Sequence, residues 1–259
     1  MKLLEALSPF LNESQQIELQ QLFFDCQNLN PCDFYKKHKK FVDKHWDKED
    51  FIEHYQYHEN TLPNLQQILS VQYLTEIKFA MSIDWSGEEY QGQIKKFLHS
   101  RLKHYGYSDI KLNDSAIKNK LKNNEVKRGE WIPLLLNCFD KQVAFANLKI
   151  ANLSLGDDEY NIALVPYDWF VKMNKAVIDG YLEVTDTSIW ELKILEIGEN
   201  KAKAMILLKS RFNVALSEIK DFISVLPIDL GRGSEKQLLK LKHEYEQAGC
   251  KMQLDKCDE

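Results

Sequence analysis

The chain has 259 residues, of which 44% are hydrophobic and 28% charged, which excludes an intrinsically disordered protein and suffices for two ordinary domains. The formal net charge of −5 argues against a general nucleic-acid binder, although it leaves room for a local basic patch. No apolar run approaches the roughly 20 residues that span a bilayer, so we expect no membrane segment.

Residues 1–10 and the cysteines indicate the cellular compartment to expect. Residues 1–10 hold a broken apolar run, whereas a secretion signal has a basic start and a continuous apolar stretch. The five cysteines are scattered and form no C-x-x-C pair, which favours reduced thiols over disulfides. We therefore expect a cytoplasmic protein.

The first eighty residues are expected to be helical. Apolar residues recur at helical spacing after Asn12, which is a good N-cap. Pro31 interrupts the pattern, and Asp33 is expected to cap the next helix. Further short helices should follow, the last of them starting near Pro63.

A mixed region comes next. Residues 78–85 have the composition of a strand, and residues 90–105 return to helical spacing. Residues 106–130 are polar and poorly periodic, which indicates a loop or a weak helix. The apolar run 131–139 predicts a strand, with Pro133 at its start or edge.

The clearest local pattern is a hairpin in residues 145–166. Two apolar runs flank the polar residues 156–159, which predict a four-residue turn. A helix over residues 167–178 should follow. The polar residues after it predict a boundary between a domain of residues 1–183 and one of residues 189–259.

The second domain is expected to fold as one small sheet with three helices. Leu192 and Ile194 alternate with polar residues, as in an amphipathic strand. Ser234 and Gln237 form a capping box ahead of a helix, and Gly249 is expected to end that helix before a last strand. The predicted order is β-α-α-β-α-β, and the predicted fold class of the whole chain is α+β.

The second domain resembles the C-terminal domain of the ribosomal stalk protein L7/L12. The helix of residues 216–223, with the pattern L-x-E-x-K-D-x-[VI], and the ending of residues 246–254, with E-x-A-G-x-x-x-x-L, carry the resemblance. In that family the first two helices of the domain recruit translation GTPases. The resemblance therefore implies a partner-binding surface made by the matched residues Lys201, Ala202, Met205, Lys209 and Lys220.

Three positions depart from the stalk pattern. Ile206 stands where the family has a lysine, and Asn213 and Ala215 replace the glycines of the turn between the two helices. The domain also balances twelve basic against twelve acidic residues from Ile189 onward. Because a compact basic face works by matched charge, these departures speak against an identical partner.

The middle of the chain, about residues 78–180, resembles an uncharacterised bacterial family with a domain of unknown function. The resemblance rests on residues 83–88 (I-D-W-S-G-E) and on residues 156–166, which contain G-D-D-E-Y and end in A-L-V-P. The resemblance implies that the region folds as one domain of that family. It implies no catalytic activity and no ligand.

Acidic residues form the first candidate site. Asp84 and Glu88 follow one predicted strand, and Asp157 and Asp158 lie in the predicted turn, so together they could hold Mg²⁺ or Ca²⁺. Acidic side chains are also common in turns because they hydrogen-bond the local backbone, and the spacing matches no EF-hand. We assign no metal and no cofactor.

A histidine pair and a basic stretch are the other candidates. His54 and His58 have zinc-ligand spacing without a third ligand, so a solvated pair is the simpler interpretation. Between Lys95 and Arg128, ten basic residues stand against three acidic ones, with His and Tyr interleaved, which suits RNA, an acidic protein or a merely solvated surface. The basic patch is represented by Lys95, Lys96, Arg101, Lys103, Lys127 and Arg128.

No stretch of the chain has the pattern of an active site. We expect a non-enzymatic bacterial interaction or regulatory protein, such as an immunity protein that binds a toxin or a translation component. One alternative is a metal-dependent enzyme that uses the Asp84/Glu88 and Asp157/Asp158 acids. Another is a ribosome- or RNA-associated factor that uses the basic stretch.

Overall fold

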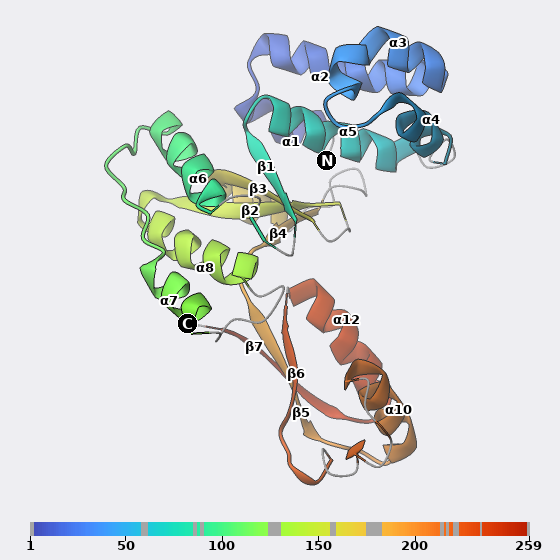
Figure 1. Cartoon of the computed structure of the whole chain (residues 1–259), viewed down its shortest axis with the longest axis vertical. Helices are drawn as coiled ribbons and strands as arrows, with labels where there is room; N and C mark the ends of the chain where they lie inside the picture. The colour runs from blue at the N-terminus through green and yellow to red at the C-terminus, as the bar shows by residue number, and fades with distance from the viewer. Residues whose placement is uncertain are drawn as a thin grey trace. The chain divides into compact units, whose positions relative to one another are not determined.

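The chain is α+β, as predicted, and divides into two compact units (Figure 1). The first unit consists of Met1–Leu112 and Gln142–Thr185, and the second of Asn113–Lys141 and Asp186–Glu259. The predicted division at residues 183–188 stays a prediction. The computed structural model describes residues 3–57, 62–84, 87–88, 91–123, 131–155, 159–174, 183–212, 215, 218–219, 223–233 and 235–257.

The first unit begins with a group of helices that pack on one another (Figure 1). They enclose a cluster rich in aromatic rings, in which Phe34, Phe51 and Tyr55 are buried. The side chain of Asn12 accepts from the backbone of Gln15 and the reverse bond is also present, so the predicted N-cap is confirmed as a capping box. The helices are α1 (Leu3–Leu7), α2 (Glu13–Asn28), α3 (Pro31–Val42), α4 (Lys48–Tyr57) and α5 (Leu62–Glu76), with a 3₁₀ turn, η1 (Ser8–Phe10), after α1.

The predicted start of α3 is wrong by three residues. Asn30 is the N-cap, since its Oδ1 accepts from the backbone N of Asp33 at 3.0 Å, and Asp33 is the third residue of the helix. The physical reason is Pro31. Its fixed φ and missing N–H suit the first position of a helix, so the proline starts this helix.

A four-stranded sheet completes the first unit. Its strands are β1 (Ala80–Asp84), β2 (Leu148–Ser154), β3 (Glu159–Pro166) and β4 (Glu183–Asp186), in the order β1-β3-β2-β4. β2 and β3 form the predicted antiparallel hairpin, and β1 pairs antiparallel with β3. Residues 156–158 of the predicted turn lie outside the described residues. β4 occupies part of the polar segment expected to be a boundary, and its Val184 is buried.

Besides α5, which contacts β1, the helices α6 (Gln93–His104) and α9 (Tyr167–Asn174) pack on this sheet. α6 buries Ile94, Leu98 and Leu102, and α9 buries Phe170 and Met173. α6 contacts β3, whereas α9 contacts both strands of the hairpin. A 3₁₀ turn, η3 (Ala144–Ala146), leads into β2. Within the described part of the chain, no helix combines the length and the apolarity that crossing a bilayer requires.

Two helices follow in the segment where the sequence predicted first a loop or a weak helix and then a strand, and this segment belongs to the second unit up to Lys141. α7 (Ser115–Lys122) lies in the polar stretch, and the run predicted as a strand at residues 131–139 belongs to helix α8 (Trp131–Val143). The strand prediction is wrong because apolar residues are so dense in residues 131–139 that they hide the helical spacing, which continues through Phe139 to the buried Val143. Pro133 is the third residue of α8, within the first turn, where the backbone N–H groups have no intrahelical partner. The buried residues at helical spacing are Ile132, Leu135, Leu136, Phe139 and Val143.

The rest of the second unit is a three-stranded antiparallel sheet with helices. Its elements are β5 (Trp190–Glu196), α10 (Lys201–Phe212), β6 (Ile228–Gly233), α12 (Glu235–Glu246) and β7 (Lys251–Lys256), and the strand order is β6-β5-β7. Leu192, Ile194 and Leu238 are buried in its core, as predicted. Gly249 has φ +83° after α12, and the N–H of Cys250 bonds the carbonyl of Tyr245, so the predicted helix end is confirmed. The predicted capping residue Ser234 lies outside the described residues.

Candidate functional site

A groove of about 710 Å³ borders β1 in the first unit, and we call it the edge groove. The volume lies in the range of ordinary ligand pockets. Its walls come from the end of α5, the segment between α3 and α4, and one face of α6, while β1 lies along its floor. The groove is lined by Lys44, His45, Gln72, Thr75, Lys78, Ala80, Met81, Ser82, Gln93, Lys96, Phe97, Ser100 and Glu159.

The charge of the edge groove is predominantly positive. Three lysines line it, against Glu159 as the acidic lining residue. Lys44 forms an ion pair with Glu76, whereas neither Lys78 nor Lys96 has an ion-pair partner among the described residues. Two exposed cationic side chains therefore remain available to an anionic group in the groove.

The imidazole of His45 contributes an uncharged polar group to the lining of the edge groove. Burial lowers the pKa of its imidazole, and the neighbouring Lys44 lowers it further, against an opposing effect of Glu76. The ring is therefore neutral at neutral pH. Its Nε2 is buried and makes no hydrogen bond to any described residue.

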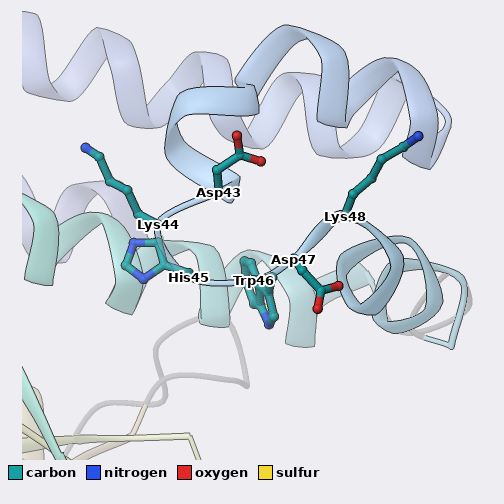
Figure 2. A pocket seen from close by; sticks show the side chains of 6 residues that line it. All are labelled: Asp43, Lys44, His45, Trp46, Asp47 and Lys48. Carbon is teal, nitrogen blue, oxygen red and sulfur yellow. The ribbon is translucent and has the colours of Figure 1, made fainter.

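A second hollow, of about 490 Å³, follows the segment between α3 and α4 (Figure 2). Figure 2 shows its six lining side chains, Asp43 to Lys48, spread along the segment rather than converging on one point. Trp46 packs its ring against Phe51, at 5.4 Å between centroids, and so belongs to the core of the helices. The geometry offers no concentrated set of groups for binding.

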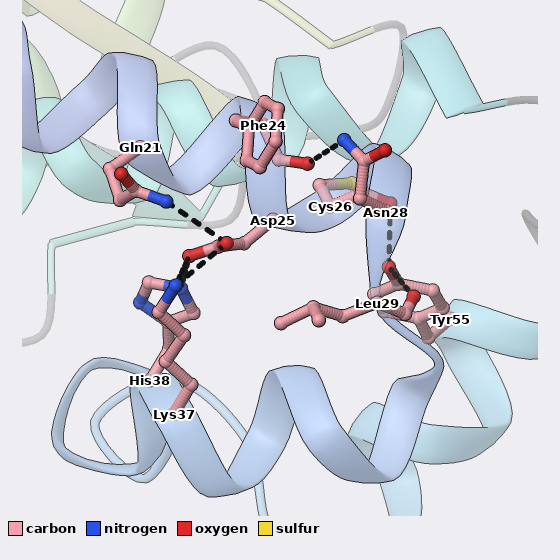
Figure 3. Close-up of polar contacts among 9 residues, drawn as sticks. All are labelled: Gln21, Phe24, Asp25, Cys26, Asn28, Leu29, Lys37, His38 and Tyr55. Carbon is pink, nitrogen blue, oxygen red and sulfur yellow. Dashed lines mark hydrogen bonds and ion pairs between the residues drawn. The ribbon is translucent and has the colours of Figure 1, made fainter.

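The most buried carboxylate among the described residues is that of Asp25 on α2, which is 2% exposed (Figure 3). Its carboxylate accepts a hydrogen bond from Gln21 Nε2 at 3.0 Å and from Lys37 Nζ at 2.8 Å. His38 Nε2 lies 2.8 Å from Oδ2. Since an ionised carboxylate only accepts, Nε2 of His38 carries the proton.

The electrostatics of Asp25 favour its charged form. Burial alone would raise the pKa of this carboxyl, but the hydrogen bonds from Lys37, His38 and Gln21 outweigh burial and lower the pKa. The cluster joins α2 to α3, and the backbone of α3 departs from helical geometry at His38 itself. The neighbouring thiol of Cys26 is no nucleophile, because burial raises its pKa to about 11. We therefore interpret the cluster as structural.

The acidic residues predicted to form a metal site are only partly brought together. Asp84 and Glu159 are direct partners in the β1–β3 register. Glu88 instead accepts backbone hydrogen bonds at the start of α6, from Gly92 at 3.0 Å and Ile94 at 2.7 Å. Its carboxylate is thus occupied by a helix N-terminus. Asp157 and Asp158 lie outside the described residues, within which no group of three or more His, Cys, Asp or Glu side chains has metal-site geometry.

The basic stretch is divided between the units. Its first part, up to Lys111, belongs to the first unit, and α7 with its lysines belongs to the second. Arg101 stacks over the rings of Phe79 and Tyr105, at 5.2 and 5.6 Å from their centroids, so this guanidinium packs against the protein. Lys96 lines the edge groove, Lys103 is exposed, and Lys95 is half-buried. Lys127, Arg128 and the predicted zinc ligand His58 lie outside the described residues.

Four of the five residues matched to the stalk family lie on α10, where they share one stripe with Ile206, a departure from that family's pattern. Ala202, Met205, Ile206 and Lys209 follow helical spacing, and Lys201 flanks them. Ile206 is 62% exposed, whereas Ala204 and Leu208 on the opposite side are fully buried. We call Lys201, Ala202, Met205, Ile206 and Lys209 the α10 face. Lys220 lies outside the described residues.

Two of these features escaped the sequence analysis. The edge groove joins residues from segments far apart in the chain, and no local pattern announces it. Asp25 carried a usable signal, because it stands beside Leu22 and Cys26 on the apolar side of α2. An acidic residue at a buried position requires donors, and these are Gln21 on α2 itself and Lys37 and His38 on α3.

A known family matches most of the first unit and also residues 113–141 of the second. No curated protein is significantly similar to the chain. Residues 1–179 match a family described as a domain of unknown function, DUF6630. This match includes α1 to α9, the edge groove and the Asp25 cluster, and it confirms the predicted resemblance of the middle region to an uncharacterised family. The chain therefore belongs to the DUF6630 family.

Proposed function

We propose that this protein acts by binding another protein rather than by catalysis, and that the α10 face makes the contact. The observation that carries the proposal is Ile206, a large apolar side chain 62% exposed at the centre of a helical stripe. Lys201 and Lys209 lie at the two ends of that stripe. An apolar centre within a charged rim is the usual composition of a protein-binding surface.

The second unit is, in this proposal, a module of the L7/L12 C-terminal type. The order β5, α10, β6, α12, β7 and the central position of β5 are compatible with the expected β-α-α-β-α-β fold. Arg211 Nη2 donates to the carbonyl of Leu230 at 2.8 Å and so fixes the end of α10 on β6. A face held on a rigid scaffold loses little entropy when a partner binds, which supports its use as a docking surface.

The lysines favour a partner with an acidic surface, such as a toxin or a translation component. Ile206 separates two versions of the proposal, because the stalk family has a lysine at this position. If the partner is a translation GTPase bound as in that family, Ile206→Lys strengthens binding of the purified GTPase. If the apolar side chain is itself buried in the contact, Ile206→Lys weakens binding of the partner.

The direct test compares capture by three forms of the full chain. We would immobilise the wild type, Ile206→Asp and Ile17→Asp in parallel and incubate each with a lysate of the organism that makes the protein. Ile17 lies on α2 and is 59% exposed, so it controls for the loss of an exposed helical isoleucine. We expect at least one protein to bind wild type and Ile17→Asp alike and to bind Ile206→Asp about thirtyfold more weakly. Identical sets of captured proteins from all three forms would contradict the proposal.

One observation favours a second candidate, a metal-dependent enzyme. Asp84 and Glu159 are paired across β1 and β3, and β3 begins directly after Asp157 and Asp158 in the sequence. Carboxylates gathered at such a strand end could hold Mg²⁺ or Mn²⁺. A divalent metal at about 100 times its Kd should then stabilise the protein by about 2.7 kcal/mol. An unchanged melting temperature across mixed divalent metals would rule this candidate out.

A further inference from the structure

The open side of β1 is a second surface that could take a partner. β1 is the first strand in the order β1-β3-β2-β4, so one of its sides pairs with β3 and the other borders the edge groove. We propose that an extended acidic segment of a partner protein binds along this open side and adds a strand to the sheet. This site lies in the first unit and does not depend on the α10 face.

The hydrogen bonds of β3 identify the β1 residue that faces the groove. The backbone N of Asn161 donates to Asn152 Oδ1 on β2 at 2.9 Å, so the backbone groups of Asn161 point towards β2. Thr185 Oγ1 on β4 donates to the carbonyl of Asn152. The backbone of Asn152 therefore points towards β4, which agrees with the alternation of the hydrogen-bonding sides. Asn161 is the register partner of Ser82, and this pair is therefore a non-hydrogen-bonded one. The N–H and C=O of Ser82 consequently point away from β3.

These backbone groups are open. Ser82 is exposed, and within the described ranges no backbone hydrogen bond outside the β1–β3 ladder involves its N–H or its carbonyl. Its side chain points elsewhere, since Ser82 Oγ donates to Asn161 Oδ1 at 2.6 Å. An exposed strand edge with unpaired donors and acceptors is a template for another strand.

The side chains around the edge favour an acidic segment. Lys78 lies two residues before the first residue of β1, and Lys96 lies on the groove-lining face of α6. Both side chains are exposed, and neither has an ion-pair partner among the described residues. Successive side chains of an added strand would point to opposite faces of the sheet. Carboxylates at alternate positions could therefore reach these lysines while the backbone pairs with Ser82.

A protein segment fits the groove better than single-stranded nucleic acid does. Nucleic-acid grooves of this kind combine basic residues with several aromatic rings on which bases stack. Phe97 is half-buried, and His45 is the other ring among the lining residues. The outward N–H and C=O of Ser82 offer nothing to a stacked base but can pair with the backbone of a peptide.

The test uses a fluorescein-labelled peptide of about six residues that alternates glutamate and threonine, the length of an ordinary strand. Its binding to the full chain is followed by fluorescence anisotropy, beside a lysine–threonine peptide and a single-stranded oligouridine. We expect the acidic peptide to bind, the basic peptide not to bind, and the oligouridine not to displace the acidic peptide.

Two pairs of variants localise the binding. Ser82→Pro removes the outward N–H but no ladder bond to β3, which an edge strand tolerates, and should abolish binding. Ser82→Ala removes the same hydroxyl and should bind as wild type does. Lys96→Glu should weaken binding about tenfold, because an attraction becomes a repulsion. Lys103→Glu changes the same charge at an exposed position of α6 that does not line the groove, and should have little effect.

Three results would overturn the proposal. The first is equal binding of the acidic and the basic peptide, or of neither. The second is displacement of the acidic peptide by oligouridine. The third is a loss of affinity in Lys103→Glu equal to that in Lys96→Glu, and this pair stays decisive even if Ser82→Pro fails to fold.

Discussion

Neutralising Asp25 should lower the free energy of unfolding of the first unit. This loss should be present only above the pH at which the carboxyl ionises. The perturbation is Asp25→Asn, which keeps the shape of the side chain and removes its charge. In the wild type this carboxylate is 2% exposed and faces Gln21, Lys37 and His38 at 2.8–3.0 Å. The substitution therefore converts charge-assisted hydrogen bonds into neutral ones.

The magnitude follows from the burial of each partner. A charge-assisted hydrogen bond contributes about 1 kcal/mol more than a neutral one, and two such bonds reach the buried carboxylate, one from the exposed Gln21 and one from His38, whose side chain is 15% exposed. The side chain of Lys37 is 49% exposed, so its ion pair with Asp25 contributes little. We expect Asp25→Asn to lower the free energy of unfolding by about 2 kcal/mol at neutral pH.

The pH dependence has a definite sign. The folded state lowers the pKa of Asp25 below its ordinary value of 3.8, so the carboxylate stabilises the fold fully above that value. This contribution is lost as the pH falls through the lower pKa of the folded state. The stability gap between wild type and Asp25→Asn should therefore be constant from neutral pH down to about 4 and close below it.

The assay is urea unfolding followed by tryptophan fluorescence. In a background with Trp131 and Trp190 replaced by Phe, the remaining tryptophans all belong to the first unit. The matched control is Asp33→Asn on α3, whose exposed carboxylate pairs with Lys36, and its stability should stay close to that of the parent. Equal stabilities of Asp25→Asn and parent at neutral pH, or a gap that persists at every pH below 3.8, would refute this reasoning.

Three further predictions concern other parts of the chain. Gly198→Ala should destabilise the second unit by about 1–3 kcal/mol in urea unfolding, because the new Cβ would lie 1.9 Å from the carbonyl oxygen of Gly249; an unchanged midpoint would contradict it. Tyr55→Phe should cost the first unit about 1–2 kcal/mol, since the hydroxyl donates to the carbonyls that end α2, at 2.7 and 3.2 Å, and a stability equal to wild type would refute this role. Iodoacetamide at neutral pH should alkylate the exposed Cys32 well before Cys26, whose burial raises its pKa to about 11, and mass spectrometry showing equal rates would contradict that order.

The parts of the fold that the sequence predicts best are those with strong local periodicity. The hairpin of β2 and β3, the N-cap at Asn12 and the buried pair Leu192 and Ile194 all follow from patterns within a few residues. α8 was missed because its apolar residues are so dense that they fit either a strand or a helix. The spacing of its buried residues, rather than their composition, separates the two.

The candidate sites were less accessible from the sequence, because they depend on tertiary contacts. Glu88 was grouped with metal-binding acids, yet its carboxylate holds the first turn of α6. Arg101 was counted in a basic patch, yet its guanidinium stacks on Phe79. The edge groove brings Lys78 beside Lys96 only when β1 is placed at the edge of the sheet, which no local pattern specifies.

The most direct test of protein binding through the α10 face is site-specific photo-crosslinking in cells. A photoreactive amino acid replaces Ile206 in one form and Ile17, which is equally exposed on another helix, in the other. We predict a discrete crosslinked adduct from position 206 that is absent from position 17. The same adducts from both positions, or none from position 206, would contradict the proposed function.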